Sequence, residues 1–123
     1  MLFDSTVLIA HLRGDRRATD LIRGALADGG AFASVLSRTE IEGGMRSAER
    51  APVGRLFTGL ELVPVTDAIA ARAGEHLRKY RRSHSGIDIV DYLLAATAEH
   101  LGTPFATLNV RHFPMIKALR PAF

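Results

Sequence analysis

The sequence predicts an α/β fold of three layers, in which a central, mainly parallel sheet of four or five strands is flanked by helices. Short apolar runs alternate with longer segments of helical periodicity along the whole chain. Strands separated by helices favour a parallel sheet that is covered on both faces. The chain has 123 residues, 47% of them hydrophobic, which is enough for one sizeable core. Residues 1–123 are therefore expected to form a single domain.

The first half of the chain predicts two strands and four helices. The apolar runs at residues 1–3 and 31–36 are the expected strands. Helical periodicity marks the segments 6–13, 16–26, 37–50 and 53–59. Ser37 is the polar residue expected to begin the third of these helices.

The second half predicts two more strands and two long helices. Residues 60–65 and 105–108 are the apolar runs, and a fifth strand, if one forms, lies near Leu119. Thr66 is a suitable helix cap and Asp67 a suitable first-turn acid, so a helix is expected from there to about residue 82. The second helix spans residues 88–100 and ends before a stop signal at 102–104.

Asp91 stands on the apolar face of this last helix. The stripe at helical period consists of Ile87, Val90, Leu94, Ala98 and Leu101, whereas Tyr92, Ala96, Glu99 and His100 are expected to face the other way. Burying an unpaired carboxylate costs several kcal/mol. Asp91 therefore indicates a capped helix start, a buried ion pair or a metal site in a cleft.

Two further carboxylates are expected near Asp91. Asp4 ends the first strand, and Glu40 lies one turn into the helix that follows the second strand. Open α/β sheets bind their ligands at the carboxyl ends of the strands. Three carboxylates that converge there would repel one another unless a cation held them. Oxygen ligands suit Mg²⁺ or Mn²⁺, and no cysteine or paired-histidine spacing favours zinc.

A basic run from Arg78 to His84 carries four fixed positive charges, in a chain whose formal net charge is +3. One interpretation is contact with RNA phosphates, with Tyr80 available for stacking on a base. The other is a solvated helix end, where cations complement the helix dipole. Both interpretations remain open from the sequence.

Several classes of function are disfavoured. The chain has no cysteine, no Gly-rich phosphate loop, no apolar run of the roughly 18 residues that a membrane helix needs and no signal-like start. A cytoplasmic location is expected. An aspartyl-phosphate hydrolase would need a second acid two residues after Asp4, where Thr6 stands.

Four segments carry a resemblance to a known family: DSTVLIA at 4–10, SRTEIEGGMR at 37–46, DYLLAATA at 91–98 and TLNVRHFP at 107–114. Their order and spacing resemble those of PIN-domain ribonucleases of the VapC toxin type, over essentially the whole chain. The resemblance implies a PIN-like fold and a catalytic set of Asp4, Glu40, Asp91 and Asn109. It makes Asp4 and Asp91 the direct magnesium ligands. It also places the Ser5 and Thr6 hydroxyls where they orient Asp4 or contact a phosphate.

The resemblance further implies a Mg²⁺-dependent endoribonuclease that inhibits translation, with Mn²⁺ as a substitute. Its implied partners are RNA, a VapB-type antitoxin that occludes the site, and a second copy of the chain, with promoter DNA reached only through the antitoxin. Many members carry another acid just before the Phe of the last segment, where this chain has His112. Asn109 or water is then left as the fourth metal ligand. A catalytically impaired module that binds RNA or protein remains the alternative.

Overall fold

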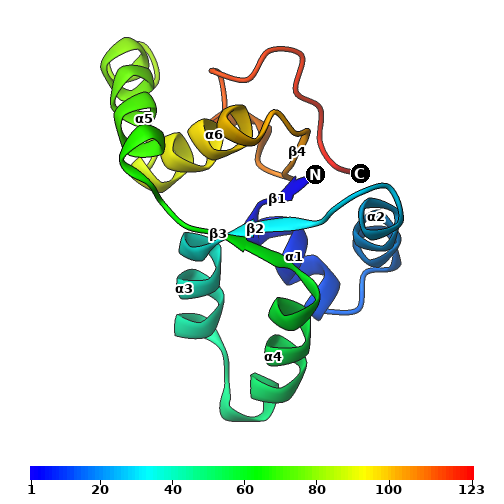
Figure 1. Cartoon of the computed structure of the whole chain (residues 1–123). Helices are drawn as coiled ribbons and strands as arrows, with labels where there is room; N and C mark the ends of the chain where they lie inside the picture. Colours follow the sequence, from blue (N-terminus) through cyan, green and yellow to red (C-terminus); the bar gives the residue numbers. More distant parts are fainter.

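The computed structural model describes residues 1–123 and contains a four-stranded sheet (Figure 1). The strands are β1 (Leu2–Phe3), β2 (Phe32–Ser34), β3 (Glu61–Val63) and β4 (Phe105–Ala106). Their order is β3-β2-β1-β4, and every neighbouring pair is parallel. The predicted α/β fold with a parallel sheet is confirmed.

The fifth strand expected near Leu119 does not form. Pro121 has no N–H to donate to a sheet, and Ala118 adopts a left-handed conformation with φ of 57°, which breaks an extended run. The segment around Leu119 instead has no regular structure. Near its end, the Ala122 N–H donates a hydrogen bond to the Thr107 carbonyl at 2.9 Å.

Six α-helices surround the sheet, and two 3₁₀ helices interrupt the connections. The α-helices are α1 (Ser5–Leu12), α2 (Arg16–Ala27), α3 (Val35–Gly44), α4 (Arg50–Gly59), α5 (Asp67–Tyr80) and α6 (Ile89–Leu101). The 3₁₀ helices are η1 (Ser47–Glu49) and η2 (Val110–His112). None of the helices has both the length and the apolar character needed to span a membrane.

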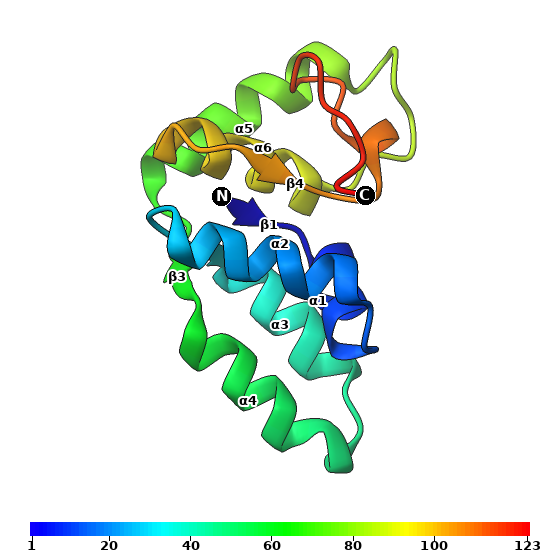
Figure 2. The ribbon, with the colours of Figure 1, turned by 90° about the vertical axis from the view of Figure 1, so that its right-hand side faces the viewer.

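Alternation along the strands separates two hydrophobic cores. Leu2 and Phe105 face a core shared with α5 and α6, and their neighbours Phe3 and Ala106 face a core shared with α1, α2, α3 and α4. Figure 2 shows α5 and α6 on one side of the sheet and the other four helices on the opposite side. The molecule thus has the predicted three layers.

Two expectations about helix boundaries are wrong. Ser34, not Ser37, caps α3, because the Ser34 hydroxyl accepts the N–H of Leu36 at 3.1 Å. The helix expected over residues 37–50 ends at Gly44, since adjacent glycines at 43 and 44 weaken it, and η1 and α4 follow.

The expected outward face of α6 is also wrong in part. Tyr92 and Ala96 are each 1% exposed, whereas Glu99 and His100 are exposed as expected. The reason is that α6 is covered on one side by the sheet and on another by α5, with which it forms the most extensive helix contact of the molecule. A helix so enclosed is apolar on more than one stripe.

We expect Ser34→Ala to lower the free energy of unfolding by about 1–2 kcal/mol, because the substitution removes the hydroxyl that caps α3. Urea denaturation measures this loss. Ser37→Ala is the matched control, since Ser37 is equally buried but its hydroxyl has no hydrogen-bond partner. Equal losses for the two variants would show that the cap contributes nothing specific.

Candidate active site

Asp4 ends β1, is the N-cap of α1, and is only 5% exposed. Its Oδ1 accepts the backbone N–H of Ser5 at 2.7 Å, with the Ser5 hydroxyl at 3.4 Å. Its Oδ2 accepts the hydroxyls of Thr6 at 2.9 Å and Thr107 at 2.7 Å. These donors replace the water lost on burial and fix the orientation of the carboxylate. Of the two roles expected for the Ser5 and Thr6 hydroxyls, the hydrogen bonds to Asp4 are present, and contact with a phosphate stays a prediction.

Asp91 lies in the first turn of α6 with its side chain 16% exposed. Its Oδ2 accepts the backbone N–H of Asp88 at 3.2 Å and lies 3.0 Å from Nδ1 of His112. Burial raises the pKa of Asp91, and the contacts with Asp88 and His112 oppose that rise. Oδ1 has no protein donor. The predicted capped helix start is therefore present, a histidine contacts the carboxylate, and one carboxylate oxygen remains open.

Glu40 lies in α3, one and a half turns from its start, and is the most exposed of the three acids. Partial burial raises its pKa, and the negative charges of Asp4 and Asp91 raise it further. The charge of Asp4 also raises the pKa of Asp91. The structure thus brings together the three carboxylates that the sequence singled out, at the carboxyl ends of β1, β2 and β4.

The N-termini of three helices point toward the same edge of the sheet. α1 follows β1 directly and α3 follows β2 directly, while α6 begins where Asp88 accepts the N–H of Val90 at 2.9 Å. The positive ends of helix dipoles favour negative charge. This arrangement partly offsets the mutual repulsion of the carboxylates and suits a site for an anionic substrate.

Asn109 takes part through its backbone. Its N–H donates to the Thr107 hydroxyl at 3.0 Å, and that hydroxyl donates to Asp4. The Asn109 side chain makes no hydrogen bond, so a role for its amide stays a prediction.

The contacts of Thr107 and His112 with the carboxylates were not anticipated from the sequence. Thr107 is fully buried directly after β4, and a polar residue that ends a core strand is a signal that could have identified it. For His112 the available signal was its position where related chains carry an acid. Three of the other four histidines make contacts outside this site: His11 with Thr19, His76 with Glu99 and His84 with Ser83. The fourth, His100, is exposed.

The donor set fits a divalent cation that keeps much of its water. No three histidine or acidic side chains stand close enough to enclose an ion by themselves. Mg²⁺ is commonly held by one or two carboxylates and several waters, so Asp4 and Asp91 would suffice. Burial raises the pKa of Glu40 and of Asp91, and repulsion among the acids adds to the rise. A bound cation would relieve that repulsion.

A groove of about 570 Å³ adjoins the acidic cluster between α1, α3 and the start of α4. Six of its eleven lining residues are hydrophobic, and Glu40 is among the remainder. The apolar members are Ile9, Leu12, Ile41, Met45, Ala48 and Val53. The groove therefore combines an apolar surface with the charged residues Arg13, Arg46 and Glu49 besides Glu40, and it reaches the candidate site.

Comparison with protein families matches residues 1–117 to the PIN domain. The chain is 51% identical to "Ribonuclease VapC10" of Mycobacterium tuberculosis over all of this chain and 92% of that protein. It is 42% identical to "Ribonuclease VapC19" of the same organism over 99% of this chain and 98% of that protein.

Solved structures share the fold at lower identity. A toxin-antitoxin complex from Klebsiella pneumoniae superposes with a TM-score of 0.80 at 19% identity, covering 99% of this chain and 97% of that one. DNA-bound VapBC from Salmonella typhimurium gives a TM-score of 0.80 at 19% identity, covering 98% and 94%.

We expect Glu40→Gln to raise the melting temperature of the metal-free protein at neutral pH. The pKa of Glu40 is raised in the folded state, so protonation of Glu40 stabilises the fold. This contribution to stability is complete below the unfolded pKa of glutamate, at about pH 4, and is lost as the pH rises through the folded pKa. A neutral amide avoids the loss. Thermal melting in EDTA, at about pH 4 and at neutral pH, measures the change in melting temperature.

Glu42→Gln is the matched control, because Glu42 lies on the same helix and pairs with Arg38 at 3.1 Å. It should give no gain at neutral pH. An equal gain for Glu40→Gln at acid and neutral pH would contradict the electrostatic explanation.

Proposed function

Because the chain belongs to the PIN-domain family, we propose that it is a ribonuclease toxin of the VapC type that cleaves RNA phosphodiester bonds, thereby inhibits translation, and acts in the cytoplasm. The observation that carries the proposal is the meeting of Asp4, Glu40 and Asp91 at the carboxyl ends of the strands. Relatives named as ribonucleases match the full length of the chain.

Ribonucleases with a PIN domain generally depend on a divalent metal. In this chain Asp4 and Asp91 would hold Mg²⁺ or Mn²⁺, and the ion would supply positive charge beside the scissile phosphate. Hydroxyl donors keep Asp4 in one orientation. Asp88 and His112 occupy one oxygen of Asp91 and leave the other free to bind.

Glu40 is the residue we assign to proton transfer. Its raised pKa makes its carboxylate a better proton acceptor than an ordinary glutamate, and its exposure lets water reach it. It would take the proton from the attacking water while the helix N-termini stabilise the charge on the phosphate.

The proposed partner is a VapB-type antitoxin seated in the apolar groove between α1 and α3. Related folds are solved as toxin-antitoxin complexes, two of them with DNA. A groove of this volume and composition suits an amphipathic helix or extended segment. Contact with promoter DNA would come through the antitoxin, and self-association as a homodimer stays a prediction.

Asp4→Asn and Asp91→Asn should each reduce cleavage of cellular RNA by at least about 100-fold, since each removes a charged ligand without changing side-chain size. EDTA should abolish cleavage by the unaltered protein. Gel analysis of total RNA with purified, antitoxin-free protein measures both effects. Asp67→Asn is the control, because Asp67 is a first-turn acid of α5 and has no contact with the cluster.

If the unaltered protein binds RNA or antitoxin but cleaves no RNA, the proposed ribonuclease activity is contradicted, and a catalytically impaired binding module is favoured. Cleavage that survives both aspartate substitutions would contradict the assignment of the site.

Leu12→Asp should weaken binding of the co-expressed cognate antitoxin by at least about tenfold, because it places a charge in the apolar groove. RNA cleavage should persist, since Leu12 lies outside the acidic cluster. Leu26→Asp is the matched control, as Leu26 is 50% exposed on α2 and outside the groove. Co-purification followed by titration measures the affinity, and similar losses for both variants would contradict this binding surface.

A further inference from the structure

A polar pocket of about 400 Å³ lies between the α5–α6 loop and η2. Its lining comprises Ser83, His84, Ser85, Gly86, Ile87, Arg111 and His112. Only Ile87 is hydrophobic, and no carboxylate is present. Since a water molecule takes about 30 Å³, the pocket has room for on the order of ten waters, and hence for a phosphate group with its sugar.

The hydrogen-bonding groups of this pocket suit an anion. Arg111 is exposed and forms no ion pair, so its guanidinium is free to bind a phosphate with two hydrogen bonds. The Ser83 hydroxyl lies 2.8 Å from Nδ1 of His84. The same hydroxyl donates to the Tyr80 carbonyl at 3.4 Å. Nε2 of His84 forms no hydrogen bond within the protein, which leaves this nitrogen available to a ligand.

A second pocket, which contains basic residues, is less suitable for an anion. A cavity of about 410 Å³ near the end of α5 contains Arg72, Lys79 and Lys117, but Glu75 also lines it. Arg72 is already paired with Glu75 and Glu99, each at 2.7 Å. An anion there would compete with carboxylates that are already in place.

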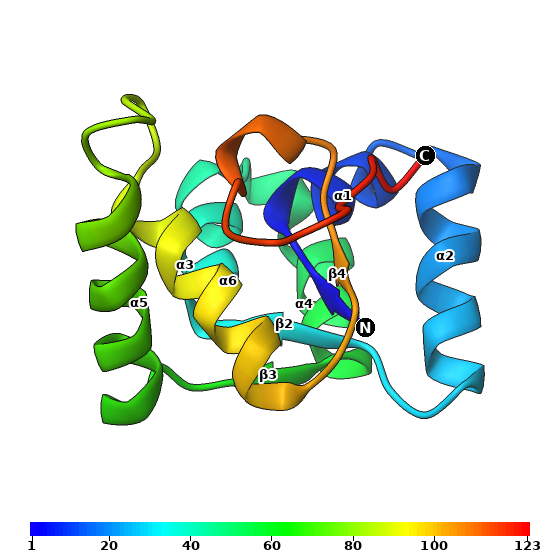
Figure 3. The same cartoon turned by 90° about the horizontal axis from the view of Figure 1, so that it is seen from above.

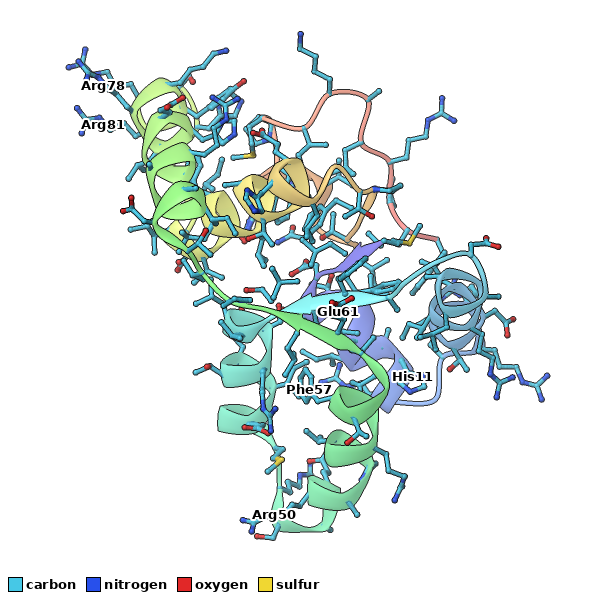
Figure 4. The ribbon with its side chains drawn as sticks, in the orientation of Figure 1. His11, Arg50, Phe57, Glu61, Arg78 and Arg81 are labelled. Atoms are coloured by element: carbon cyan, nitrogen blue, oxygen red, sulfur yellow. The ribbon has the colours of Figure 1, made fainter.

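The structure also divides the basic run that begins at Arg78. Arg78 and Arg81 project outward from the end of α5 (Figure 4), whereas Ser83 and His84 turn into the pocket. The α5–α6 loop and η2 lie on the same edge of the molecule (Figure 3). The end of the run therefore lines the pocket, together with Arg111 from a distant segment.

His112 joins this pocket to the candidate active site. Its ring lines the pocket, and its Nδ1 lies 3.0 Å from Oδ2 of Asp91. A strand of RNA whose scissile phosphate lies at Asp91 would thus bring a neighbouring phosphate past His112 and into reach of Arg111.

We propose that the pocket formed by Ser83, His84 and Arg111 binds a backbone phosphate of the RNA next to the one that is cleaved. The proposal rests on the proposed ribonuclease function and adds a substrate-binding subsite to it. The subsite recognises the phosphodiester backbone, so it contributes affinity and position along the strand without reading a base.

The test is binding of a short fluorescent single-stranded RNA of mixed sequence, measured by anisotropy in EDTA over a range of salt. Arg111→Gln should weaken binding roughly tenfold and reduce the slope of log Kd against log salt by about 0.7, the value for one phosphate contact on a single strand. Arg50→Gln is the matched control, because Arg50 begins α4 at the opposite end of the molecule from Arg78 and Arg81 (Figure 4), and its substitution should cause a much smaller change.

His84→Gln should cause a smaller loss, and its effect should not add to that of Arg111→Gln if both side chains hold the same phosphate. A loss for Arg111→Gln no larger than that of Arg50→Gln, or fully additive losses, would overturn the subsite. The binding assay needs no cleavage. A protein that binds RNA through Arg111 but cleaves none would therefore contradict the proposed ribonuclease activity and still support the phosphate subsite.

Discussion

The hydrogen bond from Thr107 to Asp4 is the interaction on which the candidate site depends. The two residues are 103 positions apart in the chain. They meet because β1 and β4 pair with Leu2 opposite Phe105 and Phe3 opposite Ala106, so the residue that follows each strand emerges at the same level. Thr6 then accepts the N–H of Leu108 at 3.1 Å and donates to the same carboxylate. A register shift of one residue would remove this network and exchange the two faces of the strand.

Three acidic side chains, Asp4, Glu40 and Asp91, lie at the candidate site, and neutral groups of the fold stabilise them in part. Backbone N–H groups, hydroxyls and helix N-termini surround the acids, and their partial positive charges reduce the repulsion. The pKa values of Glu40 and Asp91 are nevertheless raised, first by burial and then by the neighbouring negative charges. Functional sites commonly retain such strain, because groups arranged for binding are not arranged for maximal stability.

The order of strands and helices could be predicted because periodicity is a local property of the sequence. The meeting of Asp4, Glu40 and Asp91 could also be predicted, since parallel strands end at one edge of the sheet. The burial of Tyr92 could not, because it depends on how closely α5 covers α6. Nor could the contact of His112 with Asp91, which depends on the path of an irregular segment after β4.

Glu40 belongs both to the acidic cluster and to the apolar groove. Ligands of the two surfaces would share this residue, so we expect occupation of one surface to change the free energy of binding at the other. Thermodynamic linkage makes this coupling reciprocal. If a segment bound in the groove lowers the affinity of the acids for their ligand, then occupation of the acids lowers the affinity of the groove for that segment by the same factor. The concentration of substrate or cation would then help to set how readily a groove-bound inhibitor is released.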